Sequence, residues 1–164
     1  IVKVYDVDER YRTLFIIMEY VKGEMLQSLI RRLGVVPPGT AARFLWQACS
    51  ALAYAHERGI VHRDINPANL IVAPNQRVKV LDFGLACPTG TADFDGLGTA
   101  AYMAPEQIEG DPLDGRADIY ALGVTAFEML TGRRPFPEDE AMRLMKLHLT
   151  QDIPDPKALN PHIP

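Results

Sequence analysis

The chain has 164 residues, of which 48% are hydrophobic and 23% are charged, as is typical of one folded domain rather than of a disordered segment. Its net charge of -4, with isolated arginine pairs at residues 31–32 and 133–134, gives no reason to expect binding to nucleic acid. No apolar run approaches the roughly 18 residues that a membrane span needs, and two cysteines make no disulfide framework, so we expect a cytoplasmic protein.

The first predicted elements are two strands joined as a hairpin. Residues 1–7 and 13–20 are rich in β-branched and aromatic side chains, and the polar stretch 8–10 between them is typical of a turn. The chain starts inside the first of these runs, without an initiator methionine. We therefore expect it to be a piece of a longer protein.

Two helices are predicted next. Residues 24–33 place leucine and isoleucine at helical spacing, and Gly34 ends the pattern. A longer helix is predicted over residues 40–58, with Gly59 as its stop signal. The residues expected on its buried stripe are Leu45, Cys49, Leu52 and Ala55.

The rest of the chain combines irregular segments with core helices. Residues 60–84 alternate short apolar runs with turn residues, which predicts short strands and loops. Residues 85–106 lack periodicity and are typical of a functional loop. Residues 117–130 are apolar nearly all round, which predicts a buried helix, and a last helix is predicted around residues 138–149.

Two motifs carry the chemistry. The first is the run HRDINPAN at residues 62–69, and the second, thirteen residues after Asn69, is Asp82-Phe83-Gly84. They place a candidate base and several oxygen donors in one ordered series, which suits a reaction that needs a positioned hydroxyl and a bound magnesium–nucleotide. Together with the runs 98–106 and 118–123, these motifs resemble those of eukaryotic-type serine/threonine protein kinases, of the kind found in bacteria.

This resemblance implies an α+β, protein-kinase-like fold. Residues 1–20 would be the last hairpin and hinge of a kinase small lobe, and residues 21–164 a mostly helical, C-terminally truncated large lobe. The implied activity is transfer of the γ-phosphoryl group of ATP to a serine or threonine hydroxyl of a protein substrate. Asp64 would orient that hydroxyl, and Asn69 and Asp82 would hold magnesium. The isolated piece is expected to be inactive.

The same resemblance implies supporting roles around the catalytic loop. Thr99 would hydrogen-bond near Asp64, which is a feature of serine/threonine kinases. Asp118 would hold the backbone of the loop, since a buried carboxylate needs hydrogen-bond partners. His62 would be a packing residue that supports Phe83.

The implied adenine site lies at the hinge between the two lobes. Met18 would guard the back of the pocket, and the backbone of Glu19 and Val21 would pair with the base. Ile71 would pack beneath the adenine ring, and Glu24 would reach the ribose. Taken by themselves, these residues fit an apolar strand that runs into a turn equally well. They are assigned to the hinge only because of their position relative to the catalytic motifs.

An arginine beside the catalytic aspartate indicates control by phosphorylation. Arg63 would need a compensating anion, and a phosphate on Thr91, or secondly on Thr89, would supply it. The alternatives are that both threonines are ordinary loop residues, or that Asp93 and Asp95 supply the negative charge without modification.

One position departs from the family pattern. Asn66 stands where serine/threonine kinases carry a lysine that contacts the transferred phosphate, and Ala68 stands at a position where tyrosine kinases place an arginine. Loss of one preorganised charge at a transition state lowers the rate by on the order of 10²–10³. The alternative function is therefore a pseudokinase that binds nucleotide or serves as a scaffold.

Overall fold

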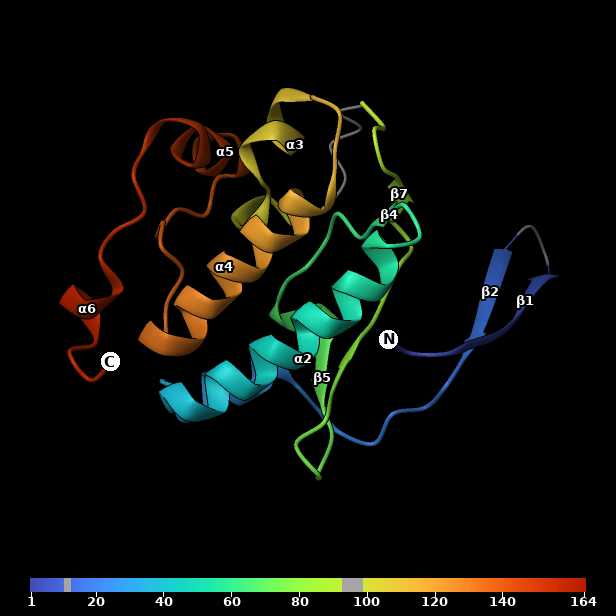
Figure 1. The fold of residues 1–164 in the computed structure, drawn as a ribbon, viewed down its shortest axis with the longest axis horizontal. Helices are drawn as coiled ribbons and strands as arrows, with labels where there is room; N and C mark the ends of the chain where they lie inside the picture. Colours follow the sequence, from blue (N-terminus) through green and yellow to red (C-terminus); the bar gives the residue numbers. More distant parts are fainter. Residues whose placement is uncertain (11–12, 93–98) are drawn as a thin grey trace.

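The computed structural model describes residues 1–10, 13–92 and 99–164 (Figure 1). Helices and small antiparallel sheets follow one another along the chain, which confirms the predicted α+β class. The described residues do not include Asp93 and Asp95, the alternative sources of negative charge, or Gly98, the first residue of the run 98–106.

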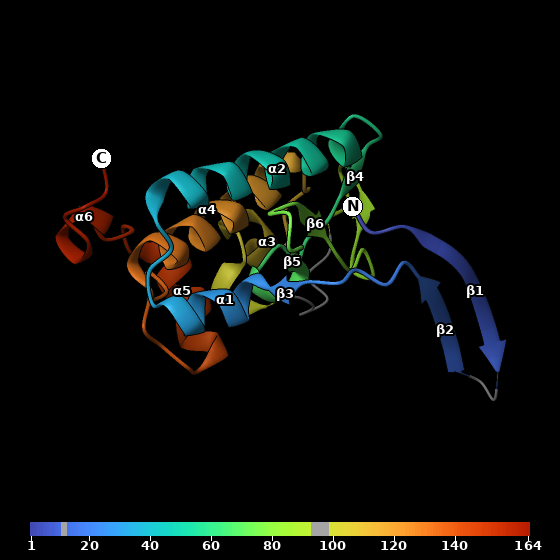
Figure 2. The ribbon, with the colours of Figure 1, turned by 90° about the horizontal axis from the view of Figure 1, so that it is seen from below.

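A hairpin projects from the helical body. Strands β1 (Val4–Arg10) and β2 (Thr13–Met18) pair antiparallel in the predicted hairpin, with Val7 opposite Ile16. The predicted turn at residues 8–10 is wrong, because these residues continue β1 and pair with residues 13–15. Figures 1 and 2 show the hairpin standing clear of the helices at one side of the molecule. Its exposed apolar side chains include Val4, Tyr5, Val7, Phe15, Ile16 and Ile17. Because these side chains are exposed, their burial does not stabilise the hairpin. The hairpin is held together mainly by the hydrogen bonds between its two strands.

The helical body contains the core. Its helices are α1 (Leu26–Leu33), α2 (Pro38–His56), α3 (Pro105–Glu109), α4 (Gly115–Thr131), α5 (Ala141–Thr150) and α6 (Pro156–Leu159). Helices α2 and α4 pack against each other, and the view in Figure 2 shows them side by side. The central helix α4 is buried on most sides, as its apolar sequence predicted, and the Asp114 side chain caps its first turn by accepting from the Arg116 N–H at 2.8 Å.

Helix α2 forms where predicted, but the expected stripe is wrong by one position at two of its four residues. Leu45 is half-buried and Cys49 is exposed, whereas Phe44 and Ala48 are buried. Both sets share Leu52 and Ala55 and have helical spacing, so periodicity did not separate them. The Phe44 ring buries more apolar area than a Leu45 side chain and decides which face turns inward.

Two small sheets hold the loop at residues 62–69 at both ends. Strand β4 (Ile60–Val61) precedes the loop and pairs with β7 (Cys87–Pro88). Strand β5 (Leu70–Val72) follows it and lies between β3 (Glu24–Met25) and β6 (Val78–Val80). Two 3₁₀ turns complete the region, η1 (Pro67–Asn69) inside the loop and η2 (Ala100–Tyr102) beyond it. The loop therefore starts and ends in paired backbone.

The side chain of His148 is buried against aromatic rings. One hydrogen bond of 2.7 Å joins the Nδ1 of His148, in α5, to the Tyr120 hydroxyl. The Phe136 ring lies edge-on to the imidazole ring. The Nε2 of His148 is buried without a hydrogen-bond partner among the described residues. Burial lowers the pKa of His148 below its usual value of 6.5.

We predict that the free energy of unfolding falls as the pH drops below about 6.5, because the unfolded chain then binds a proton that the folded His148 rejects. Above about pH 6.5 the histidine is neutral in both the folded and the unfolded state, so it does not change the free energy of unfolding with pH. Urea unfolding at about pH 5.5 and about pH 7.5 measures it. A His148→Phe variant should flatten the slope, whereas His162→Phe, at an exposed histidine, should leave it unchanged; equal slopes in both variants would contradict the assignment.

Candidate functional site

The backbone of the loop at residues 62–69 is held from α4. The Asp118 carboxylate, which is 1% exposed, accepts hydrogen bonds from the His62 N–H at 2.9 Å and the Arg63 N–H at 3.0 Å. It also accepts from Nε2 of His56 at 2.7 Å. Arg63 has a φ of 67°, a strained value for a residue with a side chain, and these bonds hold it there. The expected role of Asp118 is confirmed.

His62 links the loop to the segment that carries Asp82. Its Nε2 donates to the Leu81 carbonyl at 2.8 Å, and its Nδ1 accepts from the Asp64 N–H at 3.3 Å. Because a carbonyl oxygen only accepts, this arrangement needs the neutral ring with the proton on Nε2. The Phe83 ring packs against the imidazole with 4.5 Å between centroids, which confirms the expected contact.

The Asp64 carboxylate is surrounded by donors. Its Oδ1 accepts from both the backbone N–H and the hydroxyl of Thr99, each at 2.9 Å. Its Oδ2 accepts from the Asn69 amide nitrogen at 2.8 Å. Two donors satisfy Oδ1, so the acceptor capacity that remains for another hydroxyl lies on Oδ2.

Asn69 is bonded to Asp64, and Asp82 follows a residue that is bonded to Asn69. The Asn69 amide nitrogen donates both of its N–H groups to Asp64, to the carbonyl and to Oδ2, each at 2.8 Å, which leaves the Asn69 Oδ1 available to a ligand. The Asn69 carbonyl also accepts from the Leu81 N–H at 2.9 Å, so Asp82 follows a residue bonded to the loop. An amide oxygen and a carboxylate are donors that Mg²⁺ prefers.

Gly84 lies close to the side chain of Asp82. Asp82 has a φ of 57°, and its Oδ1 accepts from the Gly84 N–H at 3.0 Å. A Cβ atom at position 84 would lie 2.8 Å from that oxygen. The missing side chain of Gly84 permits this close approach.

Asn66 has a role that the sequence did not reveal. The side chain is 4% exposed, and its amide nitrogen donates to the Asp64 carbonyl at 3.1 Å and to the Thr99 hydroxyl at 3.2 Å. Its Oδ1 accepts from the Ala68 N–H at 2.8 Å and caps η1. The amide thus bridges two segments more than thirty residues apart. The Asn-Pro pair is a known turn signal and could have indicated the cap, but not the bridge.

The predicted hinge residues lie beside the Asp82 segment. Met18, at the end of β2, lines a hollow of about 220 Å³ together with Asp82, Phe83 and Gly84. The Glu19 N–H donates to the Lys3 carbonyl at 2.8 Å, which leaves only the carbonyl of that residue for a base. The Glu19 carboxylate pairs with Lys79 of β6, and that hydrogen bond lowers the pKa of Glu19.

The remaining predicted nucleotide residues lie along β3 and β5. Ile71 is buried in β5 with Met25 of β3 opposite, and Val21 is half-buried in the link to β3. The Glu24 carboxylate is bound by the Arg32 guanidinium at 2.7 Å, which lowers the pKa of Glu24. A ribose contact by Glu24 would have to share it with this arginine.

The predicted regulatory residues lie on either side of β7. The Arg63 Nε donates to the Leu85 carbonyl. The Thr91 hydroxyl donates to the Pro88 carbonyl at 2.7 Å, and the Thr91 carbonyl accepts from the Leu113 N–H at 3.0 Å. The backbone N–H of Thr89 donates to Gly59 at 2.8 Å. Hydrogen bonds to other parts of the chain therefore fix the backbone of both threonines.

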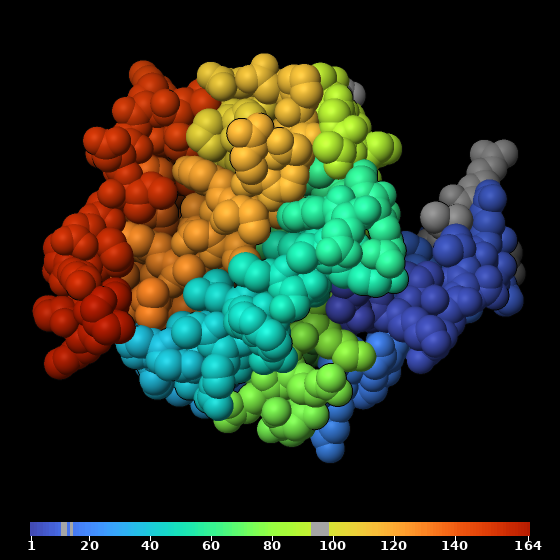
Figure 3. All heavy atoms as spheres, viewed as in Figure 1, coloured from blue at the N-terminus to red at the C-terminus, as the bar shows by residue number. Residues whose placement is uncertain are grey.

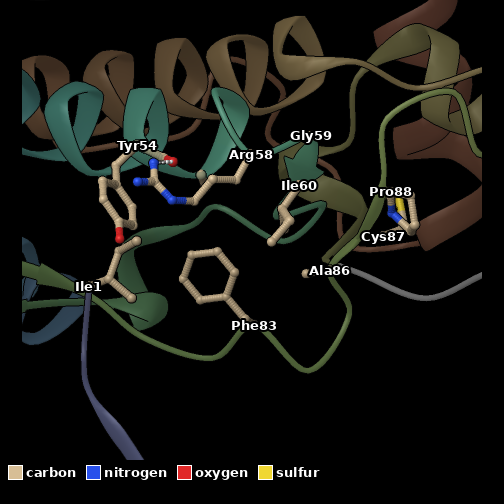
Figure 4. A pocket seen from close by; sticks show the side chains of 10 residues that line it. Ile1, Tyr54, Arg58, Gly59, Ile60, Phe83, Ala86, Cys87 and Pro88 are labelled. Carbon is tan, nitrogen blue, oxygen red and sulfur yellow. Dashed lines mark hydrogen bonds between the residues drawn. The ribbon is translucent and has the colours of Figure 1, made fainter.

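A second hollow lies on the other side of Phe83. It has a volume of about 600 Å³, and Figure 4 shows the Phe83 ring pointing into it between Ile1 and Ile60. Its polar lining comes mainly from Arg58, whose guanidinium lies 3.5 Å from the centroid of the Tyr54 ring. It contains no carboxylate or amide side chain, so we place the chemistry at the Asp64 side.

Similarity to known proteins agrees with this geometry. The model of a family described as "Protein kinase domain" matches residues 1–162. The serine/threonine-protein kinase PrkC of Bacillus subtilis (strain 168) is 40% identical over 168 residues, which cover 100% of this chain and 26% of that protein. The serine/threonine-protein kinase PknB of Mycobacterium leprae (strain TN) is 38% identical over 161 residues, 93% of this chain and 26% of that protein. The chain thus spans about a quarter of the length of these curated relatives.

Proposed function

The chain belongs to the protein kinase family, and we propose on that premise that the protein transfers the γ-phosphoryl group of ATP to a serine or threonine hydroxyl of a protein substrate. The observation that carries the proposal is the bonding of Asp64 to Asn69 of its own loop and to Thr99 of a distant segment. The names of the relatives support the same reaction, since they are serine/threonine-protein kinases.

In this proposal Asp64 orients the substrate hydroxyl through Oδ2. Thr99 occupies Oδ1 with two donors, so the hydroxyl approaches the oxygen that only Asn69 contacts. In phosphoryl transfer the protein forms no covalent bond to the substrate, and it accelerates the reaction mainly by positioning. Holding the hydroxyl oxygen in line with the phosphorus is therefore the main contribution expected of Asp64. The proton of the hydroxyl goes to the Asp64 carboxylate while the hydroxyl oxygen bonds to the γ-phosphorus and the bond from that phosphorus to the bridging oxygen of ADP breaks, so that ADP leaves.

Magnesium would be held by the Asn69 Oδ1 and the Asp82 carboxylate. The described residues contain no cluster of three or more His, Cys, Asp or Glu side chains that could bind a metal, so phosphate and water oxygens would complete the shell, as Mg²⁺ sites usually allow. The bound ion would neutralise charge on the phosphates. The adenine would lie against the hinge at Met18, Glu19 and Val21.

The proposal also covers the two lobes, two further contacts to the nucleotide and the place of the reaction in the cell. Residues 1–20 would act as the end of a small lobe and residues 21–164 as a large lobe, with Ile71 beneath the base and Glu24 towards the ribose. We found no helix among the described residues that is long and apolar enough to cross a bilayer. We propose that the reaction takes place in the cytoplasm, where ATP is available and Cys49 and Cys87 stay reduced.

Control by phosphorylation remains part of the proposal. A phosphate on Thr91 would remove the hydroxyl that now donates to Pro88 and free this part of the loop. The new anion would then compete for the guanidinium of Arg63, which bonds to the backbone of Leu85. Thr89 is the second candidate.

A second function, a pseudokinase that binds nucleotide or serves as a scaffold, is favoured by Asn66 alone. Both N–H donors of its amide are already used inside the protein, so the position offers no donor to the transferred phosphate. Radiolabelled ATP transfer by the full-length protein distinguishes the two functions. No transfer by the wild type, with nucleotide binding intact, would favour the scaffold.

The variant Asn66→Lys tests the missing charge. We expect it to raise kcat by up to about 10²-fold with little change in the KM for ATP, because a cation would act mainly on the transition state. Asn66→Gln, which adds length without charge, is the control. A fall in kcat in both variants would show that the bridge to Thr99 matters more than the charge.

A further inference from the structure

One surface of the molecule combines an exposed tryptophan with unpaired cations. Trp46 is the single tryptophan of the chain, and it is 72% exposed on the outer side of α2. It lines a hollow of about 410 Å³ between α2 and β6, and these two segments lie on the face seen in Figure 3. The residues that we call the Trp46 face are Arg43, Trp46, Gln47, Ser50, Arg77 and Lys79.

The floor of this face is rigid. The Gln47 amide donates to the Gln76 carbonyl at 3.0 Å and accepts from the Val78 N–H at 3.0 Å, which ties α2 to the turn between β5 and β6. The turn is closed by the Ala73 N–H, which donates to the Arg77 carbonyl at 2.9 Å. A preformed surface loses little conformational entropy when a partner binds.

The face is cationic although the chain has a net charge of -4. Residues 38–56 and 72–80, which build it, contain no Asp or Glu. Neither Arg43 nor Arg77 forms an ion pair with a carboxylate in the part of the chain that the structure describes. Lys79 pairs with Glu19 at the far edge. Two guanidinium groups are therefore available to an incoming anion.

We propose that the Trp46 face binds an acidic segment of a partner protein, with an apolar side chain of that segment in the hollow beside the indole. Tryptophan and arginine dominate the energetics of protein interfaces, and a guanidinium holds a carboxylate through two hydrogen bonds. Single-stranded nucleic acid also uses aromatic rings and cations. It fits less well, since such binding depends on the neutralisation of several phosphates, and on the Trp46 face only Arg43 and Arg77 lack an ion pair with another described residue. The proposal does not depend on phosphoryl transfer.

The natural probe is Trp46 itself. We would titrate the full chain with a peptide of about twelve alternating Glu and Leu residues and follow the tryptophan emission, using a Lys–Leu peptide and oligo-dT as the comparison ligands. We expect a saturable shift to shorter wavelength with the acidic peptide only, and an affinity that falls as salt is added. Arg77→Glu should weaken binding by at least about tenfold, whereas Arg133→Glu, the same change at an exposed arginine after α4, should not.

Circular dichroism checks that each variant folds, and Arg43→Glu on the surface of α2 replaces Arg77→Glu if that variant does not. Three results would overturn the proposal: no saturable shift with the acidic peptide, equal binding by the Arg77 and Arg133 variants, or preferential binding of oligo-dT. Loss of kinase activity in the full-length protein would leave these results unaffected, so the two proposals fail separately.

Discussion

Replacement of Asp64 by asparagine should lower kcat for phosphoryl transfer by about 10²- to 10⁴-fold, the usual contribution of a general base. The amide keeps the shape of the side chain but cannot take up the proton of the substrate hydroxyl. It also places an N–H or an oxygen opposite Asn69, whose amide nitrogen now donates to Oδ2 at 2.8 Å. Asn69 keeps its second bond to the Asp64 carbonyl, so we expect the KM for magnesium–ATP to change much less than kcat.

The control for this experiment is Asp111→Asn, the same chemical change at an exposed carboxylate in the link between α3 and α4. Initial rates of radiolabelled transfer by the full-length proteins give kcat and KM separately. A rate for Asp64→Asn within a few-fold of the wild type would remove Asp64 from the mechanism. Loss of both kcat and nucleotide binding would indicate damage to the loop instead.

Replacement of Asp118 by alanine should reduce the free energy of unfolding by about 2–6 kcal/mol, the cost of leaving two buried backbone donors without an acceptor. The carboxylate is buried and accepts three hydrogen bonds, two of them from the backbone of the catalytic loop. Without it the His62 and Arg63 N–H groups lose their acceptor, and each unsatisfied buried donor costs about 1–3 kcal/mol. The loop that carries Asp64 should therefore loosen as well.

Asp114→Ala is the matched control, because Asp114 caps the same helix from a more exposed position. Loss of such a cap costs about 1 kcal/mol. Urea unfolding of both variants, followed by circular dichroism, gives the comparison. Equal losses would mean that Asp118 acts only as a residue of the first turn of α4 and not as the anchor of the loop.

Much of the fold could be predicted where the chain repeats a simple pattern. The all-round apolar run of α4 and the two β-branched runs of the hairpin leave few alternatives, since burial and strand pairing decide them locally. The bonds from Asp64 to Thr99 and from Asp118 to the loop backbone agree with what the motifs implied. These bonds join residues far apart in the chain, and only the family resemblance could connect them.

Other features depend on contacts that no local pattern encodes. The bridge from Asn66 to Thr99 spans two segments and looks, in the sequence, like a missing lysine. The buried stripe of α2 depends on which side chain fits the core, Phe44 or Leu45. The close approach of Gly84 to the Asp82 carboxylate accompanies a positive φ at Asp82, which the sequence does not show. Tertiary packing overrode the local signal in each case.

The most direct test of the account is whether Asn69 and Asp82 hold the metal that carries the nucleotide. ATP binding to the full-length protein can be measured by calorimetry with Mg²⁺ and with the metal removed by a chelator, for the wild type, for Asp82→Asn and for the exposed control Asp152→Asn. We predict metal-dependent binding that Asp82→Asn, which tolerates the same positive φ, weakens by at least about tenfold. Equal affinity with and without metal, or no effect of the Asp82 variant, would contradict it.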